Sequence, residues 1–482
     1  MAVYMAAIYS GQGMEGSASV NAPQRPPGPR SVLGIGEAIA FRRSPLTYLQ
    51  GLAASYGDVV HFRLGWKHAF LLNHPDLVQE FLVVHASKQV RGPVMQRGRA
   101  IMGDGLLTSE EPLHATQRRL IQPAFHRERI AHHAQVMGEY ASKACGRWHD
   151  GETIDLRKEM MRLTLDILGK TLFNQRIEED AGEIADAVTE LMSLVDLVFV
   201  PFSQHLMRLP LPGMRRLKRL REQFDRLIYG LIEDRMRSRI DGDDLLSMLL
   251  QHQLNEGNRE QAIRQVRDEC LTILLAGHET IANALTCALF LLAQHPEHAD
   301  TIRAEVDRIA GLRNLQGQDY ERLAFTRCVF LESLRLYPPV WLLGRALKQS
   351  CSVGPHTAPR NSILFASQYL LHRDARFFAE PETFQPDRFL GNGKAQPAYF
   401  PFGIGPRRCI GEGFALMEGV LALGTVLRRW EIEVLPETRL ALDPKITLRP
   451  KFPVIVRVKS VQQFDGTRNQ SAVRASRVPS CA

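Results

Sequence analysis

The stretch Phe402-Gly403-Ile404-Gly405-Pro406-Arg407-Arg408-Cys409-Ile410-Gly411 places one cysteine among three glycines and two arginines. Glycine permits tight turns and a close backbone approach to a bound group, and arginine supplies positive charge beside an anion. Cysteine binds metals as a thiolate, and the apolar run from Phe414 predicts a helix whose positive N-terminal end favours that charge. A buried structural thiol is the competing interpretation. The pattern is expected by chance in about one such chain in a hundred thousand, which favours a metal-binding thiolate.

This loop resembles the haem-binding loop of the cytochrome P450 family, in which the cysteine thiolate is the axial ligand of the iron. The resemblance implies that Cys409 binds the iron of haem b. It also implies that Phe402, Gly403 and Gly411 lie against the porphyrin and that Arg407 pairs with a haem propionate. The chain is thus identified as a soluble, bacterial-type member without a fused reductase, a haem-thiolate monooxygenase.

Residues 271–293 form a long apolar stretch that hydropathy alone would assign to a membrane span. A soluble protein of this size can bury such a helix completely, and the stretch is interrupted by polar residues. We therefore expect the central helix of the fold and no membrane span.

The interruption, Ala276-Gly277-His278-Glu279-Thr280, resembles the oxygen-binding signature of the family. The resemblance implies that Ala276 and Gly277 lie against the haem, with room for dioxygen at the glycine. The Thr280 hydroxyl would form a hydrogen bond with bound dioxygen, and Glu279 would supply protons. A polar kink in a core helix, with Thr280 bonded back to a carbonyl, is the alternative interpretation.

Three further basic residues stand at positions that resemble those of basic residues in the family. His114 and Arg118 lie four apart on one face of an expected helix at 112–125, and Arg345 follows an apolar segment. By the resemblance, all three reach haem propionates. A solvated His/Arg pair is the alternative for the first two. The same resemblance implies a substrate pocket formed by the residues Phe199, Phe202, Val340, Trp341 and Leu342.

Glu332 and Arg335 lie three apart in Glu-Ser-Leu-Arg, a spacing that brings two side chains to one helical face. The family buries this pair and completes it with a later arginine, here Arg388 in Pro-Asp-Arg-Phe. Buried charges must satisfy one another, so loss of one member is expected to be severe. The resemblance gives these residues a structural role on the proximal side of the haem.

The composition is that of an ordinary soluble globular protein, with 45% hydrophobic and 23% charged residues among 482. Seven cysteines without paired spacing indicate neither a disulfide framework nor a zinc site, which favours the cytoplasm. The formal charge of +8 favours an acidic partner, but no basic tract interleaved with aromatic residues indicates nucleic-acid binding.

The resemblance implies a mainly α-helical fold with a small β-rich lobe, in which the haem lies between the central helix and the cysteine loop. Residues 1–30 are expected to be a disordered lead with a proline hinge, 31–459 one catalytic domain and 460–482 a disordered tail. Met14 rather than Met1 is a candidate start. Helices are expected at 128–148, 156–173, 180–198, 214–239 and 244–251, a hairpin at 59–72 and an irregular roof loop at 92–107. Thr447 and Leu448 are expected to dip toward substrate.

The implied reaction inserts one atom of dioxygen into an apolar substrate of the fatty acid, terpenoid or polyketide class. Electrons are expected from a separate ferredoxin or flavodoxin with its NAD(P)H reductase, docked near Arg407 and Arg408 on a monomer. Two alternatives are an O2-independent isomerase or dehydratase, which the intact Glu279 and Thr280 disfavour, and a non-catalytic haem-thiolate sensor or binding protein.

Overall fold

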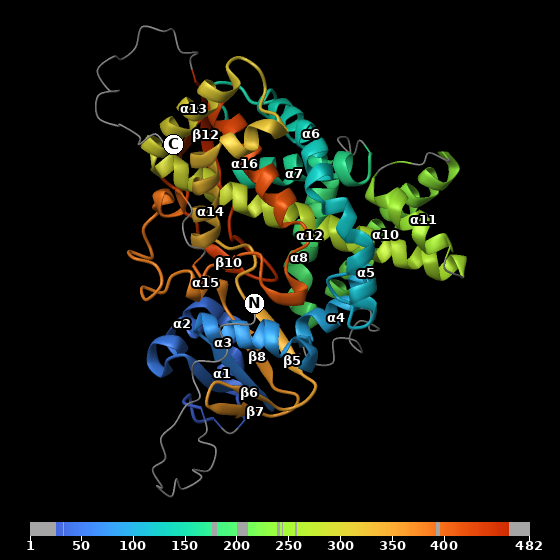
Figure 1. The fold of residues 1–482 in the computed structure, drawn as a ribbon, viewed down its shortest axis with the longest axis vertical. Coiled ribbons are helices and arrows are strands. Elements are labelled where there is room, and N and C mark those ends of the chain that lie inside the picture. Colours follow the sequence, from blue (N-terminus) through green and yellow to red (C-terminus); the bar gives the residue numbers. More distant parts are fainter. Residues whose placement is uncertain are drawn as a thin grey trace, which may run out of the picture.

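The computed structural model describes residues 26–461, except residues 32, 176–180, 200–210, 239–241, 243, 256–257 and 392–395. A large helical part and a smaller β-rich lobe lie one above the other in Figure 1. The N-terminal helices and strands build most of the lobe, and strands from the second half of the chain complete it. The expectation of a mainly α-helical fold with a small β-rich lobe is confirmed.

The helices follow the apolar periodicity of the sequence, and several begin at a capping residue. The Asp155 side chain accepts hydrogen bonds from two backbone N–H groups at the start of one helix, and Asn258 does the same for the longest. The helices are α1 (Ile35–Arg43), α2 (Pro45–Tyr56), α3 (Pro75–Gln79), α4 (Pro93–Met102), α5 (Leu113–Ile121), α6 (Arg127–Cys145), α7 (Leu156–Leu172), α8 (Ala181–Phe199), α10 (Pro212–Ser238), α11 (Leu245–Asn255), α12 (Arg259–Gln294), α13 (Pro296–Ala310), α14 (Ala324–Leu336), α15 (Gln368–Leu371) and α16 (Glu412–Arg429).

The strands form one main sheet and three small ones. The main sheet has the order β1-β2-β8-β5-β3, with β2 and β8 parallel and the other pairs antiparallel. The small sheets are β4-β12-β9, β10-β11 and β6-β7. The strands are β1 (Val59–Leu64), β2 (Lys67–Leu72), β3 (Gln89–Arg91), β4 (Thr153–Asp155), β5 (Leu343–Leu347), β6 (Cys351–Val353), β7 (His356–Ala358), β8 (Ile363–Ala366), β9 (Trp430–Val434), β10 (Leu442–Pro444), β11 (Leu448–Pro450) and β12 (Ile455–Ser460).

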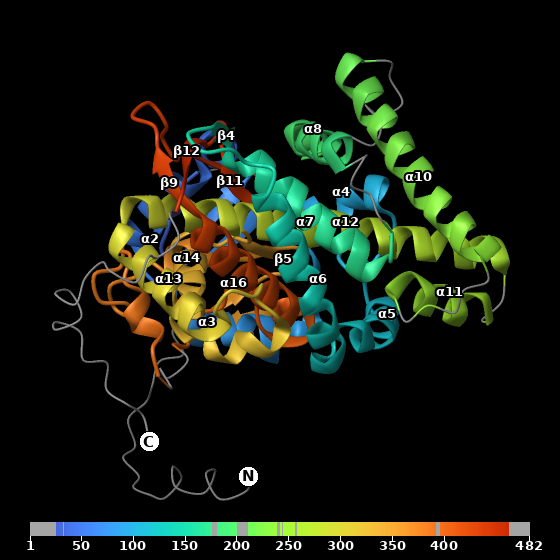
Figure 2. The ribbon, with the colours of Figure 1, turned by 90° about the horizontal axis from the view of Figure 1, so that it is seen from above.

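Helix α12 is the centre of the helical part, as expected. It runs across the molecule in Figure 2 and packs against α7, α11, α14 and α16. Its length and composition would suffice to cross a membrane, but 83% of its most apolar window is buried inside the protein. The apolar stretch therefore builds the protein core, which removes the reason to assign it to a bilayer.

The expected helices and the hairpin at 59–72 are confirmed, with ends that differ by a few residues. Two expectations are wrong. The roof segment is not irregular throughout, because Pro93 begins α4 and Gly103 ends it with a positive φ of 72°. The central helix starts at Arg259 rather than near Leu271, because its polar first turns pack beneath the roof loop.

Candidate functional site

The cysteine loop is a hydrogen-bonded turn just before α16. The backbone N–H of Cys409 donates to the carbonyl of Phe402 (2.9 Å), which closes the loop. Gly403 and Gly405 have φ values of 71° and 77°, a region that favours glycine. A side chain at Gly405 would also collide with the Leu82 carbonyl. Glycine is therefore required at both positions to expose the cysteine at the end of the turn.

We infer that the Cys409 thiol faces an internal hollow of the protein, because the thiol is both exposed and desolvated. Its side chain is exposed, yet the surrounding protein desolvates it and raises its pKa to about 11. The backbone N–H of Gly411 bonds to the sulfur, and the positive charges of Arg118 and Arg408 also oppose that rise. A thiolate here requires a cation in front of it, since the donors behind it do not compensate fully for desolvation.

Helix α12 forms a second wall of the hollow. The wall lies where the row of buried residues along this helix is interrupted. Residues 271–275, 278–279 and 281–292 are buried, whereas Ala276 is exposed and Thr280 half-buried. The Thr280 hydroxyl donates to the Ala276 carbonyl (2.8 Å), as in the alternative interpretation of this segment. A side chain at Gly277 would collide with Leu168 of α7. Packing against α7 therefore requires this glycine, and the expectation that its missing side chain leaves room for dioxygen is not supported.

Buried cations gather near the loop in excess of acidic partners. Arg91, Arg345 and His114 are buried, and Arg407 is nearly so. Burial, together with the charge of Arg407, lowers the pKa of Arg345 to about 10 and that of His114 to about 4. His114 Nδ1 contacts Glu111 (2.9 Å).

Arg407 makes one of the acidic contacts of this cluster. It donates to the Ser109 carbonyl (2.9 Å) and forms an ion pair with Glu110 (3.1 Å). Among the described residues, the Arg345 side chain donates to the carbonyl of its neighbour Gly344 (2.9 Å) and forms no ion pair. The cluster therefore fits a ligand with more than one negative charge.

Arg91 was missed by sequence reasoning, because it stands in no recognised motif. It ends β3 beside Arg345 of β5, and burial, with the charges of Arg345 and Arg407, holds its pKa well below the ordinary value. Its Nε atom is buried without a hydrogen-bond partner among the described residues. The only available signal was an arginine at the end of a short strand before Gly92-Pro93.

The residues surrounding the hollow therefore fit haem b. A cysteine thiol with a backbone donor lies on one side, a helix with an exposed alanine and a hydroxyl lies on another, and surplus buried cations match two propionates. Arg118 is half-buried and donates to the Arg408 carbonyl (2.8 Å), so it ties α5 to the cysteine loop.

Glu332, Arg335 and Arg388 lie together behind the loop. Arg335 is fully buried and binds Glu332 through two nitrogens (2.7 and 2.8 Å). Arg388 binds the same carboxylate (3.0 Å), and Arg335 also donates to the carbonyls of His372 and Pro381. The charges are thus paired and hydrogen-bonded, as a buried ion network requires.

Two of the expected pocket residues, Trp341 and Leu342, pack against the core of the β-rich lobe. Trp341 is buried in the core of the β-rich lobe and donates to the Lys445 carbonyl (3.0 Å), and its placement in the pocket stays a prediction. Leu342 packs against the same core, and Val340 is half-buried. The side chain of Phe199 and all of Phe202 lie outside the described residues.

The expectation that Thr447 and Leu448 dip toward substrate stays a prediction. Leu448 is buried in the core of the β-rich lobe. Thr447 donates to the buried carboxylate of Glu279 (3.1 Å).

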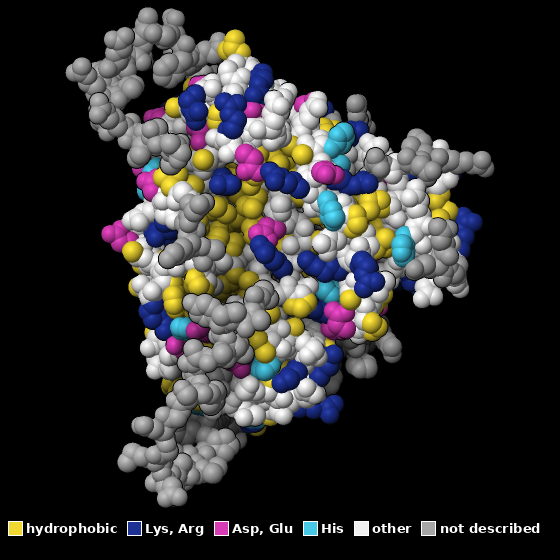
Figure 3. Space-filling model, viewed as in Figure 1, with side chains coloured by type: hydrophobic (Ala, Val, Ile, Leu, Met, Phe, Trp, Pro, Cys, Tyr) yellow, Lys and Arg dark blue, Asp and Glu magenta, His cyan; other side chains and the backbone are white. Residues whose placement is uncertain are grey.

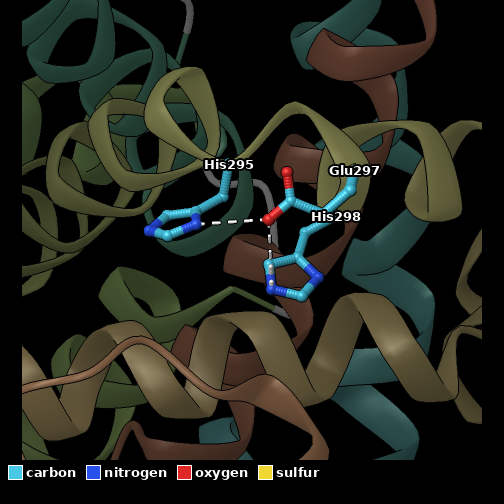
Figure 4. Close-up of side chains that lie close together, drawn as sticks. All are labelled: His295, Glu297 and His298. Carbon is cyan, nitrogen blue, oxygen red and sulfur yellow. Dashed lines mark hydrogen bonds and ion pairs between the residues drawn. The ribbon is translucent and has the colours of Figure 1, made fainter.

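One further group of possible metal ligands lies away from the hollow. His295, Glu297 and His298 stand close together at the start of α13 (Figure 4). His295 Nδ1 lies 3.3 Å from the Glu297 carboxylate, and both imidazole rings pack on Phe384. The carboxylate occupies the positive N-terminal end of α13, where a bound cation would be opposed. We therefore interpret these three residues as part of the N-terminal end of α13 and not as a metal site.

The family model for "Cytochrome P450" matches residues 26–455. The chain belongs to the cytochrome P450 family. It is 37% identical over 419 residues to cyclooctatin synthase of Streptomyces melanosporofaciens, covering 86% of this chain and 91% of that protein. A second protein of that organism, cyclooctat-9-en-7-ol 5-monooxygenase, is 35% identical, with 87% and 92% covered. Pentalenene oxygenase of Streptomyces avermitilis is 31% identical, with 85% and 91% covered.

This P450 is therefore a haem-dependent monooxygenase that uses haem b, dioxygen and electrons from a redox partner. The isomerase or dehydratase and the non-catalytic sensor are not favoured, because the relatives are named as monooxygenases and oxygenases. The resemblance of the cysteine loop correctly identified the family.

Proposed function

We propose that this P450 oxidises a cyclic terpenoid. The observation that carries the proposal is the similarity, along most of the chain, to proteins named for cyclooctat-9-en-7-ol and pentalenene. Of the three substrate classes expected from the sequence, terpenoids are the one that these names support. Fatty acids and polyketides are the alternative substrate classes in the test below.

We propose that Cys409 holds the haem iron and that Arg91, His114, Arg118, Arg345 and Arg407 hold the propionates. The support is the position of each side chain around the hollow and the surplus of buried positive charge. Phe402, Gly403, Gly411, Ala276 and Gly277 would supply the apolar contacts to the ring. When bound, the haem supplies the activation of dioxygen. The protein supplies the ligand, the orientation and the protons.

Glu279 and Thr280 are assigned to proton delivery. Thr280 stands at the wall of the hollow with a hydroxyl that donates to Ala276 and still has lone pairs to accept a proton donor. Glu279 is the adjacent carboxyl, buried and turned to the hairpin β10–β11. Glu332, Arg335 and Arg388 would maintain the fold behind the loop and touch no substrate.

A separate ferredoxin or flavodoxin is proposed to dock on the face shown in Figure 3. Lys and Arg side chains gather there across α5, α6 and α16. Arg119, Arg127 and Arg408 are exposed on these elements and the cysteine loop. Arg407 was expected to join them, but it points inward to Glu110. Charge reversal at Arg119 and Arg127 should slow electron transfer at low salt, because exposed charges steer association.

The same proposal includes a cytoplasmic monomer whose catalytic domain is residues 31–459. Six described cysteines are free, in line with a reducing compartment. The globular part begins earlier than that boundary, since the carbonyl of Pro27 accepts from His61 in β1 (2.8 Å).

Spin-state titration tests the substrate class. Cyclic terpene hydrocarbons and alcohols, long-chain fatty acids and macrolactones are each added to the ferric protein, and turnover is then assayed with surrogate redox partners. Terpenoids should shift the spin state and yield products that carry one added oxygen atom. A shift and products with fatty acids or macrolactones alone would contradict the proposal.

A further inference from the structure

The carboxyl of Glu279 is held by the C-terminal hairpin. Glu279 is buried on α12, and the hydroxyl of Thr447, in the turn between β10 and β11, donates to its Oε1 atom (3.1 Å). The next residue, Thr280, lies at the wall of the hollow. A proton that reaches Glu279 from the hairpin is therefore one residue away from the site where dioxygen is reduced.

Two arginines flank this carboxyl from different elements. Arg449 of β11 binds Asp443 of β10 through Nε and Nη2, each 3.2 Å from the carboxylate. Arg157 of α7 donates through Nε to Asn283 of α12 (3.2 Å), one turn after Glu279. The Asp443 side chain is 22% exposed, whereas that of Arg449 is 9% exposed. The pair thus connects the buried interior with solvent.

Each arginine also has an unused donor in this region. Among the described residues, Arg157 Nη2 and Arg449 Nη1 are buried without a hydrogen-bond partner. Buried guanidinium N–H groups without acceptors are costly, and a bridging water is the usual way to satisfy them. Two such donors near a buried carboxylate make a polar site suited to a water chain.

The charges around Glu279 act in opposite directions. Burial raises the pKa of Glu279, while Arg449, Arg157, Thr447 and Asn283 lower it. The carboxylates of Asp155 and Asp443 in turn raise the pKa of Arg157 and so favour its charged form. His278 on the same helix is held neutral, because burial lowers its pKa to about 4. Burial thus favours the protonated carboxyl, while the two arginines and the two hydrogen bonds favour the carboxylate.

We propose that the hairpin β10–β11 is the proton entry of this P450, with Asp443 at the solvent end and Glu279 at the inner end. Thr447 and Arg449, with Arg157 from α7, are positioning residues that orient and charge-stabilise Glu279. The proposal rests on the assignment of Glu279 to proton delivery.

The stoichiometry of the reaction fixes what this path must carry. Substrate C–H, dioxygen, two electrons and two protons give an alcohol and one water. The electrons come from the reduced partner protein, and both protons come from solvent. One O–O bond and one C–H bond break, while the C–O bond and the O–H bonds of alcohol and water form. The path carries protons only, and neither arginine gives one up.

The first experiment titrates Glu279 by infrared spectroscopy in the ferric, substrate-free protein. The carboxylic acid band is assigned by its loss in Glu279→Gln. In Arg449→Leu the titration midpoint should rise by about one to three pH units, because a nearby positive charge is removed. Arg449→Lys should restore most of the wild-type midpoint. Arg457→Leu is the matched control, since Arg457 is an arginine on β12 paired with Glu433 near the surface.

The second experiment measures peroxide released per NAD(P)H and the solvent deuterium isotope effect on turnover. Asp443→Asn and Thr447→Val should each raise both quantities at least about twofold, whereas Arg457→Leu should leave them unchanged. An unchanged midpoint in Arg449→Leu, or unchanged isotope effects in both other variants, would overturn the proposal. The carbon monoxide spectrum verifies the folding of each variant. If Asp443→Asn or Arg449→Leu fails this check, Thr447→Val takes its place. Neither readout depends on the terpenoid assignment, because any ligand that shifts the spin state serves.

Discussion

Arg91 and Arg345 are paired residues on neighbouring strands, β3 and β5, and both side chains are buried. Like charges at paired positions destabilise a sheet, and burial adds a desolvation cost for each. The lobe carries this cost unless an anion lies between the guanidinium groups. Binding of the haem propionates and stability of the β-rich lobe are therefore expected to depend on each other.

Arg345→Gln should accelerate haem loss while leaving the haem-free protein at least as stable as wild type. Charged hydrogen bonds are worth about 1.5–3 kcal/mol, so transfer of haem to an acceptor globin should be roughly 10- to 100-fold faster. Thermal unfolding of the haem-free proteins gives the second quantity. Arg457→Gln is the surface control. A haem-free variant clearly less stable than wild type would show that Arg345 is mainly structural.

Replacement of the proposed axial ligand should abolish thiolate ligation. The reduced protein exposed to carbon monoxide should show a strongly red-shifted Soret band, and Cys409→Ser should lack it. Cys351→Ser, at a buried cysteine of β6, should keep it. Retention of the band in Cys409→Ser would remove Cys409 from the proposed site.

Loss of one member of the buried ion network should prevent formation of stable haem protein. Glu332→Gln leaves Arg335 buried without its counter-charge, a change that typically costs about 3–5 kcal/mol. Arg388→Gln should cost less, since the Arg388 side chain is 14% exposed. Haem content after purification and denaturant unfolding measure both effects. Equal stability of the two variants would contradict this ranking.

Acid should loosen the segment before the cysteine loop through His372. His372 Nε2 accepts from the backbone N–H of Phe400 (3.1 Å), which requires an unprotonated ring, and burial lowers its pKa to about 3. The unfolded state, with a histidine pKa near 6.5, binds the proton first. Stability is therefore complete above about pH 6.5 and falls as the pH drops toward 3.

The size of this effect is on the order of 4–5 kcal/mol between pH 6.5 and 3. His372→Gln keeps an acceptor for Phe400 without a titrating group, so its stability should vary less between pH 6.5 and 4. Chemical unfolding at several pH values measures the slope. Parallel slopes for variant and wild type would exclude His372 as the source.

Thr280→Ala should uncouple dioxygen reduction from substrate oxidation. Removal of the hydroxyl at the wall of the hollow should raise peroxide per NAD(P)H severalfold, since a positioned proton donor contributes about 100-fold or more to such steps. Thr280→Ser should retain most of the coupling. Unchanged peroxide release in Thr280→Ala would remove Thr280 from the mechanism.

Sequence reasoning located the loop around Cys409 and the central helix with its Glu279-Thr280 pair, because these depend on local patterns. It also placed Glu332 and Arg335 on one helical face. It did not predict that Trp341 packs in the core of the β-rich lobe or that Thr447 binds Glu279, because a side chain in a short strand or turn can point to either face. Only packing decides which face. Arg91 was missed since its role depends on a strand partner 254 positions later.

The sequence by itself determined the family, the proposed haem ligand and the mainly helical fold, because a rare glycine-cysteine pattern and helical periodicity are local properties of the chain. Only the tertiary structure decided which charges are buried together, which side chains surround the hollow and where Glu279 points. These properties depend on contacts between distant segments, such as that between Thr447 and Glu279. Burial, rather than residue type, then sets the electrostatic environment of each group.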